Sequence, residues 1–568
     1  MTEVLATNIL SPLGMTTQAN YNKLSSYCSG IKFHEGKWDL SEPFCASLLT
    51  EAQNNIIAFE NLTHFESMVY FSVKEALKQT DINPSNSKIV FIISTTKGSV
   101  DVLEQEQNDV LQSSPGYSAN KIAQLLHITT IPIVACNACI SGLSAIILAS
   151  RLLNAGIYDY AIVCGADSLC KFTISGFQSL KALSIKTCRP FDIERNGLNL
   201  GEAAATIILH HTEKECRDKW YIGNGSIRND AYHISAPAKK ADGAYLALRA
   251  MMQTIDSEEI AFINAHGTAT MFNDQMESIA IERAGLSSTP INAYKASFGH
   301  TLGAAGIIES IISMAAIDHE TVLGTKGFEE YGVSGKIKIN INNEHTDKKA
   351  FVKMISGFGG CNASLVFCKD TPKIQAEIPP INTCHKVLIS PSGVYLDGNQ
   401  ISVDCNGVSQ ITALYKKYVG DYPKFYKMDM LSRLGFVASE MLLMAENDTQ
   451  RLAREDRAIM FFNSASSIDS DRKYMRSIAD KDNFYPSPSV FIYTLPNIVT
   501  GEIAIRNHYH GETSFYILPQ RNDEQISNIV ATAFLDSTTS SMIAGWLDYV
   551  NEDNYIADIK IIEITKTE

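Results

Sequence analysis

Short apolar runs alternate with longer, helix-like stretches along residues 1–370. Each run is bounded by polar or glycine residues and has the length of a buried strand. Strands are predicted at 88–94, 160–167, 206–210, 260–265, 337–341, 351–356 and 363–367. An apolar helix is predicted from Ser141 to near Gly156. Strands that alternate with helices indicate an α/β fold whose sheets carry helices on both faces.

The pattern changes after residue 370. Three prolines among polar residues follow, which is typical of a domain boundary. We therefore predict a first unit at 1–370, a linker at 371–384 and a second, smaller α/β unit at 385–568. The second unit combines predicted strands at 387–390 and 458–463 with an apolar helix at 431–445.

The two units are weakly similar. A helix at 65–77 precedes the strand at Ile89, and a helix at 430–442 precedes the strand at Ile459. This similarity suggests related halves. A common α/β architecture alone could produce the same pattern, so both interpretations stay open here.

Composition excludes several classes of protein. The chain has 568 residues, of which 45% are hydrophobic and 19% charged, as in ordinary globular proteins. The net charge of −14 argues against non-specific binding to nucleic acid. We expect a cytoplasmic protein without a membrane span, because no leader pattern and no apolar run of about 20 residues is present. The 12 scattered cysteines indicate reduced thiols.

Cys139 lies between an apolar run and an apolar helix, in Ile-Pro-Ile-Val-Ala-Cys-Asn-Ala-Cys139-Ile-Ser-Gly. The sulfur is therefore expected at a tight strand-to-helix turn, next to a helix N-terminus. We expect that setting to favour the thiolate, which is the nucleophilic form of cysteine.

Two histidines and a lysine follow in glycine-rich settings. They are His266 in Ala-His-Gly-Thr-Ala-Thr, and Lys295 and His300 in Lys-Ala-Ser-Phe-Gly-His-Thr-Leu-Gly. A lone histidine is more often a core residue than a catalytic one. A cysteine at a helix start together with two histidines and a lysine nevertheless suggests carbon–carbon bond formation at a thioester.

Asn-Ala-Cys139-Ile-Ser-Gly resembles the nucleophile motif of the β-ketoacyl-acyl-carrier-protein synthases. Four more segments resemble the same family in the same order: 189–197 with Gly201 and Glu202, 266–270 with Asp274 and Glu277, 295–306 with Glu309, and 357–362. The resemblance covers essentially all of residues 1–370. It implies a thiolase-like fold of five layers, αβαβα, over that region.

The resemblance also implies a reaction, a decarboxylative Claisen condensation. Cys139 would hold an acyl group as a thioester. His266 and His300 would donate hydrogen bonds to the enolate formed when a malonyl thioester loses CO₂. The backbone N–H groups of Cys139 and Phe358 would form the oxyanion hole.

The resemblance also implies roles for five residues around the site. Lys295 would pair with Glu309 and hold charge and orientation near His300. Thr268 and Thr270 would contact the phosphopantetheine arm of an acyl carrier protein. Phe358, between glycines, would act as a mobile gate.

The implied partners are an acyl carrier protein and a second ketosynthase-like subunit, in a homodimer or heterodimer. No metal and no cofactor beyond the carrier's phosphopantetheine is expected. The pathway is fatty acid or polyketide chain elongation. The alternative is a polyketide or aryl-polyene-type pathway with a partner similar to a chain-length factor.

A different class of function comes from the Cys136-x-x-Cys139 spacing. It could form a redox dithiol or half of a zinc site. A zinc site needs a second pair of ligands, and none stands out in the sequence. Cys136, Asn137 and Cys361 also depart from the small or hydroxyl residues that are usual in the ketosynthase motifs.

The second unit resembles the N-terminal half of a ketosynthase. If the segment 511–520 aligns with the strand that leads to Cys139, Gln520 falls in the place of the nucleophile. Chain-length factors are similar in having glutamine there; a loop glutamine is the alternative. No second His-Gly-Thr motif follows. We therefore expect this unit to be non-catalytic, with a scaffolding or partner-binding role.

Overall fold

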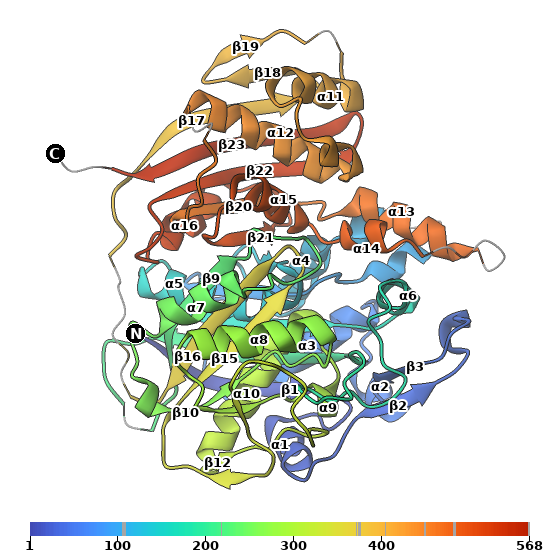
Figure 1. The fold of residues 1–568 in the computed structure, drawn as a ribbon, viewed down its shortest axis with the longest axis vertical. Helices are drawn as coiled ribbons and strands as arrows, with labels where there is room; N and C mark the ends of the chain where they lie inside the picture. Colours follow the sequence, from blue (N-terminus) through green and yellow to red (C-terminus); the bar gives the residue numbers. More distant parts are fainter. Residues whose placement is uncertain are drawn as a thin grey trace.

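The computed structural model describes residues 1–104, 110–216, 218–370, 372, 377–403, 405–447, 450–480, 484 and 486–565. Figure 1 shows two units stacked along the long axis, the first coloured blue to yellow and the second orange to red. We call them the N-terminal unit (1–370) and the C-terminal unit (381–565).

The N-terminal unit is built from two sheets with the same strand arrangement. The first has the order β5 (Ile133–Ala135), β4 (Ile89–Ser94), β6 (Tyr160–Asp167), β8 (Ala203–His211) and β1 (Thr2–Leu10). The second has the order β11 (Pro290–Asn292), β10 (Ile260–Asn264), β15 (Ala350–Gly357), β16 (Cys361–Cys368) and β9 (Tyr221–Asn229). In each sheet the first three strands are parallel and the last two pairings are antiparallel. The second sheet continues into β13 (Lys338–Ile339).

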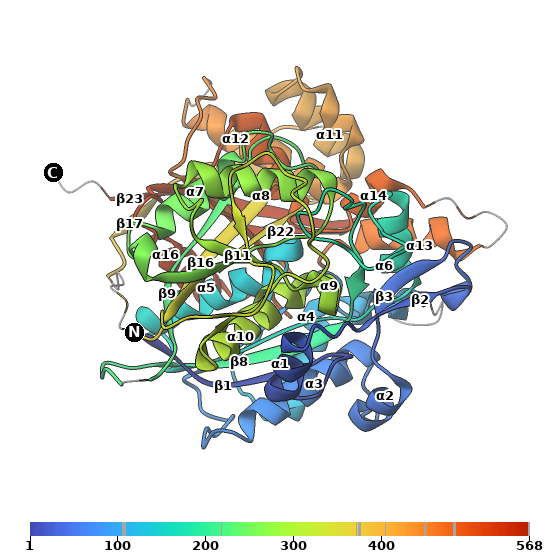
Figure 2. The same cartoon turned by 60° about the horizontal axis from the view of Figure 1, so that its bottom comes forward.

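Helices complete five layers. Helices α5 (Ser141–Asn154) and α10 (Ala305–Asp318) lie between the sheets and are almost wholly buried, as their apolar sequences require. The outer faces carry α3 (His64–Leu77) and α4 (Pro115–Leu125) on one side and α7 (Asp242–Met251) and α8 (Met271–Arg283) on the other. Figure 2 shows the succession from α7 and α8 through α5 and α10 to α3. The expected αβαβα fold is confirmed.

The C-terminal unit repeats this half-fold once more. Its sheet has the order β21 (Thr513–Ile517), β20 (Arg457–Asn463), β22 (Ser541–Asn551), β23 (Asn554–Ile564) and β17 (Ile381–Ser390). The directions match those of the first sheet. Even the register shift in β1, between Val4 and Ala6, recurs in β17 between Thr383 and His385. The weak similarity between the units therefore reflects a shared topology.

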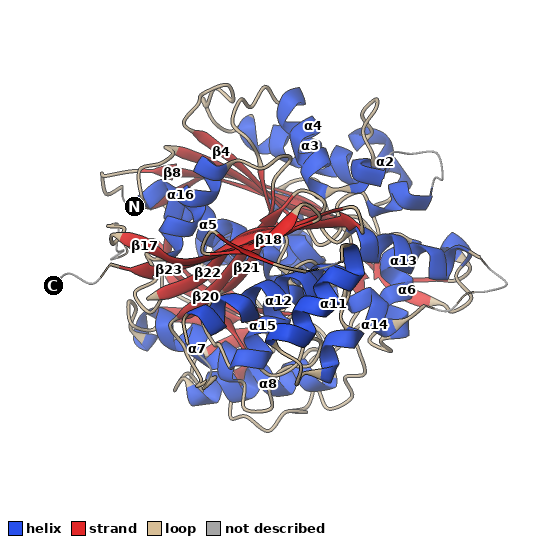
Figure 3. Cartoon of the chain, turned by 90° about the horizontal axis from the view of Figure 1, so that it is seen from above, coloured by secondary structure: helices blue, strands red, loops and turns tan. Residues whose placement is uncertain are grey.

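Helices cover both faces of the third sheet. Figure 3 shows α11 (Gly407–Tyr418), α12 (Met430–Ala445) and α15 (Ile498–Asn507) along one face, and α16 (Asp523–Ala533) beside α5 on the other. Helix α12 begins where the Asp429 carboxylate accepts a hydrogen bond from the Ser432 N–H, at 3.1 Å. Strand β17 takes in the last four residues of the expected linker. Residues 371 and 373–376 of that linker lie outside the described residues.

The remaining elements surround these layers. They are α1 (Thr17–Ser25), β2 (Ile31–His34), β3 (Phe44–Ser47), α2 (Glu51–Ile57), α6 (Lys171–Ser179), β7 (Leu200–Gly201), α9 (Lys295–Phe298), β12 (Thr321–Val322), β14 (Glu344–His345), β18 (Gly393–Leu396), β19 (Asn399–Ile401), α13 (Ile468–Ala479) and α14 (Pro488–Ile492). Within the described ranges, no helix has the length and apolar character that crossing a membrane requires.

The two units share one core. Strand β21 pairs antiparallel with β5, with Tyr516 opposite Ala135 and Ile517 opposite Val134. A single cluster of buried apolar side chains includes residues of both units. The Phe491 ring lies so close to Gly176 of α6 that no side chain fits there. Because strands, core and rings are continuous across the junction, the units form one body.

Buried ion pairs also cross the junction. Lys97 bonds Asp471 at 2.9 Å, Arg151 bonds Glu512 at 2.8 Å, and Arg228 bonds Asp536 at 2.7 Å. Removing one partner of such a pair leaves an uncompensated buried charge, at a cost of about 3–5 kcal/mol. These pairs therefore oppose separation of the two units.

Candidate active site

Cys139 projects from a strained turn. It is the middle residue of a short 3₁₀ turn, Ala138–Ile140, between β5 and α5. Ala138 has φ +49°, which is uncommon for any residue except glycine. The Asn137 side chain holds the turn by donating to Ser144 Oγ at 2.8 Å, and its N–H donates to Ser141 Oγ at 2.8 Å. The turn directs the sulfur away from the strand and into the site.

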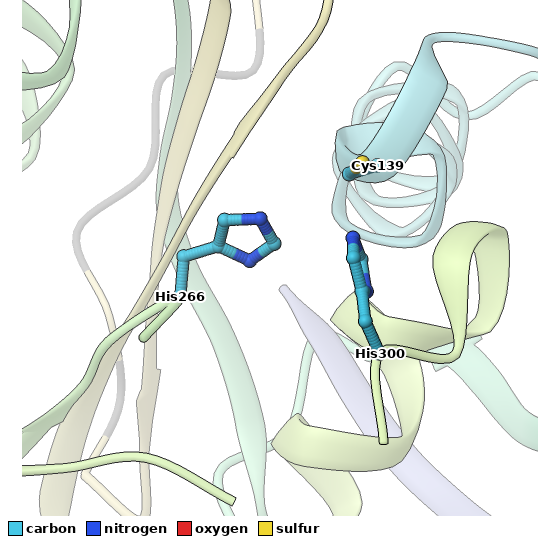
Figure 4. A group of neighbouring side chains, drawn as sticks. All are labelled: Cys139, His266 and His300. Carbon is cyan, nitrogen blue, oxygen red and sulfur yellow. The ribbon is translucent and has the colours of Figure 1, made fainter. Parts of the chain in front are cut away.

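Cys139, His266 and His300 meet. The sulfur and one ring nitrogen from each histidine all lie within 4.8 Å of one another. The two imidazole rings meet edge to face, with centroids 4.9 Å apart and an angle of 82° between planes. Figure 4 shows the His300 ring directed toward Cys139 while His266 approaches from the side. The expected proximity of these three residues is confirmed.

The His266 loop is held by two buried acids from α8. The Glu277 carboxylate accepts hydrogen bonds from the N–H groups of His266, at 2.6 Å, and Gly267, at 2.7 Å. Asp274 accepts from the Ala269 N–H at 3.2 Å. These bonds fix the loop in which Ala269 has φ +62°. The acids that follow the His-Gly-Thr motif therefore act on its backbone.

The tautomer of His300 follows from its hydrogen bonds. Its Nδ1 accepts from the Leu302 N–H at 3.2 Å, so the ring hydrogen is on Nε2. Nε2 is buried and has no hydrogen-bond partner among the described residues. The same holds for Nδ1 of His266. Each imidazole thus has a polar atom left over for a substrate.

Both imidazoles are neutral. Burial holds the pKa of His266 and of His300 well below the ordinary value, and the nearby Lys295 lowers both further. A neutral imidazole with hydrogen on Nε2 donates one hydrogen bond without carrying a positive charge. This is the form that the expected enolate stabilisation requires.

The prediction that Cys139 rests as a thiolate is wrong. Burial raises the pKa of the Cys139 thiol to about 12, and the attraction of Lys295 only partly opposes this. Cys139 is 9% exposed, so water does little to solvate a negative charge on its sulfur. Cys139 is therefore a thiol at neutral pH and must lose its proton as it attacks.

Lys295 and Glu309 lie behind the histidines as a buried ion pair, with Nζ 2.6 Å from the carboxylate. This confirms the expected pairing. A second lysine, Lys353 of β15, bonds the other oxygen of Glu309 at 2.5 Å and the Asn264 side chain at 2.7 Å. Burial lowers the pKa of Lys353 to about 8, although Glu309 opposes the shift.

Sequence reasoning missed Lys353. Its signal is a lysine inside the apolar run Phe-Val-Lys353-Met-Ile, at a position where a strand between helix layers has no exposed side. A buried lysine there requires a buried acid. Lys353 Nζ also lies 3.2 Å from the Ala265 carbonyl, so it links Glu309 to the strand end that carries His266.

A cavity of about 440 Å³ opens onto Cys139 and the two histidines. Thr268 and Thr270 line it, and their hydroxyl oxygens are 2.9 Å apart. Phe358 also lines it, half-buried, with its ring stacked on Phe177 at 6.3 Å. Lys295 and Glu309 are not among the lining residues, so they act from behind the cavity wall.

The donor set of Cys139, His266 and His300 is the one metal-like cluster among the described residues. A cation there would face the buried Lys295 and Lys353, whose charges already disfavour protonation of the imidazoles. The charge of the surroundings therefore fits a metal poorly. The redox alternative also gains no support, because the cavity reaches Cys139 but not Cys136.

The strand ladders give the counterpart of the nucleophile in the C-terminal unit. The C-terminal strands β17, β23, β22, β20 and β21 correspond in this order to β1, β8, β6, β4 and β5 of the first sheet. In this correspondence Tyr516 occupies the position equivalent to Ala135. Four residues further, Cys139 corresponds to Gln520, which is exposed. The described part of this unit has no counterpart of the elements that carry His266 and His300.

Two sequence profiles match the chain. The profile described as "Beta-ketoacyl synthase, N-terminal domain" matches residues 4–215, and "Beta-ketoacyl synthase, C-terminal domain" matches residues 221–329. Together they cover more than half of the chain. The chain belongs to the β-ketoacyl synthase family. The nucleophile turn and both histidines of this family member lie within the matched regions.

Curated relatives share part of the sequence. The 3-oxoacyl-[acyl-carrier-protein] synthase 2 of Rhizobium meliloti (strain 1021) is 34% identical over 256 residues, which are 41% of this chain and 60% of that protein. The enzyme of the same name from Vibrio cholerae is 27% identical over 405 residues, which are 64% of this chain and 98% of that protein.

Two solved structures are informative. A ketosynthase (ApeO) in complex with its chain length factor (ApeC) from Xenorhabdus doucetiae is 26% identical, with a TM-score of 0.56, and covers 65% of this chain and 97% of that chain. The PfaC keto synthase–chain length factor covers 99% of this chain and 78% of that chain, with a TM-score of 0.78 at 14% identity. The second likeness shows the fold alone, and that fold includes both units of this β-ketoacyl synthase.

Proposed function

We propose that the chain is a β-ketoacyl-acyl-carrier-protein synthase that joins an acyl group to a malonyl unit with loss of CO₂. The observation that carries the proposal is the meeting of one thiol and two neutral imidazoles within 4.8 Å at a cavity. Thr268 and Thr270 line the cavity, and in this proposal they contact the phosphopantetheine arm of a carrier protein.

The first stage loads Cys139. The thiol attacks the acyl thioester carbonyl, and the backbone N–H groups of Cys139 and Phe358 stabilise the oxyanion. Both imidazoles keep their ring hydrogens for the second stage, so the thiol proton passes to the leaving pantetheine sulfur. The pantetheine arm then leaves as a thiol, and both imidazoles stay neutral.

The second stage forms the carbon–carbon bond. A malonyl thioester occupies the cavity with its carbonyl oxygen facing His266 and His300. Loss of CO₂ leaves an enolate, whose negative oxygen accepts hydrogen bonds from the two imidazoles. The enolate carbon attacks the acyl carbonyl on Cys139. The Cys139 sulfur leaves as a thiolate and takes one proton from solvent, which balances the carboxylate lost as neutral CO₂, and a β-ketoacyl carrier product is released.

Within this class we favour a ketosynthase that contains its own chain-length-factor-like half. The C-terminal unit pairs with β5, has Gln520 in place of the nucleophile, and lies within the fold likeness to a structure described as a keto synthase–chain length factor. A polyketide or aryl-polyene-type pathway therefore fits better than ordinary fatty acid synthesis. The chain would then need no separate ketosynthase-like subunit.

Intact mass spectrometry after incubation with acyl carrier proteins of several chain lengths tests the proposal. The wild-type protein should gain the mass of the acyl group, and Cys139→Ala should not. Condensation with malonyl carrier should then remove the group from the enzyme. Loading of Cys139→Ala, or no loading of the wild type by any acyl carrier, would refute the assignment.

A further inference from the structure

The C-terminal unit reaches the gate loop through Asn497. This residue stands at the start of α15, is 2% exposed, and donates from Nδ2 to the Phe358 carbonyl at 2.9 Å. Asparagine at a helix start commonly caps its own helix through Oδ1. Asn497 makes no such cap. Its side chain reaches out of its own unit to residues 357–360, which we call the gate loop.

Gly501, one turn along α15, brings the helix against the same loop. A Cβ atom at this position would lie 2.5 Å from the Gly359 carbonyl oxygen and 2.9 Å from its Cα. Gly359 itself has φ +90°, a conformation that favours glycine. The helix and the gate loop are therefore in direct backbone contact.

A second connection runs through Asn229 of β9. Its Nδ2 donates to the Gly359 carbonyl at 2.8 Å and to Thr513 Oγ1, in the C-terminal unit, at 3.0 Å. The Phe515 N–H, also in the C-terminal unit, donates to Asn137 Oδ1 at 2.6 Å. The C-terminal unit thus contacts both loops whose backbone N–H groups are the oxyanion donors in the proposed function.

We propose that Asn497 is a positioning residue that holds the gate loop over Cys139, and this inference rests on the proposed function. The hydrogen bond from Asn497 fixes the Phe358 carbonyl, and so restricts rotation of the backbone at Phe358. This restriction would also hold the direction of the Phe358 N–H, which is the second oxyanion donor in the proposed function. The unit that lacks a nucleophile would in this way support the chemistry of the other.

Asn497→Asp is the informative variant, because it keeps the shape and replaces the Nδ2 donor with an oxygen that repels the Phe358 carbonyl. Loss of an oxyanion donor lowers the rate about 10²–10³-fold, and a misplaced donor lowers the rate by a smaller factor. We expect kcat for acyl transfer to Cys139 to fall about 10- to 100-fold, with little change in KM.

Malonyl decarboxylation supplies the contrasting readout. It depends on His266 and His300, which the gate loop does not hold, so CO₂ release should stay within about threefold of wild type. A purely structural role would lower both rates together with the folded fraction. The split between the two half-reactions therefore separates positioning from folding.

Two further variants serve as a control and as an independent test. Asn463→Asp removes a buried amide of the same unit that donates to the Ser466 carbonyl at 2.8 Å, away from the gate loop, and should spare both half-reactions. Gly501→Ala pushes on Gly359 without touching Asn497, and Ala is compatible with a helix. It should reproduce the selective loss of acyl transfer if Asn497→Asp folds poorly.

The outcomes are distinct. Selective loss of acyl transfer in Asn497→Asp or Gly501→Ala, but not in Asn463→Asp, supports the proposal. Unchanged acyl transfer in both, or equal loss of the two half-reactions in folded protein, overturns it while the proposed function stands. A wild-type protein that neither loads Cys139 nor releases CO₂ overturns the proposed function itself.

Discussion

The buried cluster of Lys295, Glu309 and Lys353 allows a quantitative test with Glu309→Gln. The carboxylate is 2% exposed and both lysines are fully buried, so the substitution leaves two ammonium groups without their counter-charge. Breaking a buried ion pair costs about 3–5 kcal/mol. With Glu309 present, the pKa of Lys353 is already lowered from 10.5 to about 8, equivalent to about 3 kcal/mol against its charged form.

We therefore expect Glu309→Gln to reduce the free energy of unfolding by about 3–5 kcal/mol at pH 7, measured by urea denaturation. Adding Lys353→Met removes one of the two ammonium groups that lack a counter-charge, and should restore about 1 kcal/mol or more of the free energy of unfolding. Glu455→Gln, at the exposed Arg249–Glu455 pair, is the matched control and should cost less than about 1 kcal/mol.

The pH dependence provides an independent check. The folded-state pKa of Lys353 is lowered, so the folded state binds its proton less tightly than the unfolded state, and this contribution to stability rises as pH increases from about 8 toward 10.5. Without Glu309 the folded-state pKa of Lys353 falls further, so the variant begins to gain this stability at a lower pH than the wild type, and its deficit should be smaller at pH 9 than at pH 7. A deficit below about 1 kcal/mol, or one that Lys353→Met makes larger, would refute the reasoning.

Three other predictions concern the site, the junction and the core. Malonyl decarboxylation should stay constant as pH falls from 7.5 to 6, because His266 and His300 are already neutral; a CO₂-release profile with a pKa near 6.5 would contradict this. Phe491→Ala, at the junction, should reduce unfolding free energy by about 3–5 kcal/mol, whereas a loss below about 1 kcal/mol would mean that the ring is not tightly packed. Burial raises the pKa of Cys164 from 9.0 to about 12, so its contribution to stability is lost as pH rises above 9; Cys164→Ala should lessen the alkaline loss by about 1.4 kcal/mol per pH unit, and identical slopes would count against it.

The sequence predicted the elements and the side chains that the fold brings together at the cavity, because both leave local signals. Apolar runs marked β4 and β6, and helix α12 lies where its apolar stretch indicated. Cys139, His266 and His300 stand in short motifs with glycine or small neighbours that allow close backbone approach. Such patterns can be recognised in a short segment of sequence, without knowing which distant segments the fold brings next to it.

What the sequence could not give depends on contacts between distant segments. Lys353 acquires its role only when β15 brings it to Glu309, and Asn497 only when α15 meets the gate loop. The ionisation of Cys139 was mispredicted because the helix start is visible in sequence, whereas the depth of burial around the sulfur is not. Desolvation outweighs the favourable helix end at this position.

The pairing of β5 with β21 has a consequence for how the N-terminal and C-terminal units stay associated in dilute solution. Two separate proteins joined by such a junction would come apart below their dissociation constant and could exchange partners with paralogues. Here a covalent connection gives the junction a high effective concentration at any dilution. Each N-terminal unit, with its Cys139, is thus permanently matched, one to one, with the same C-terminal unit.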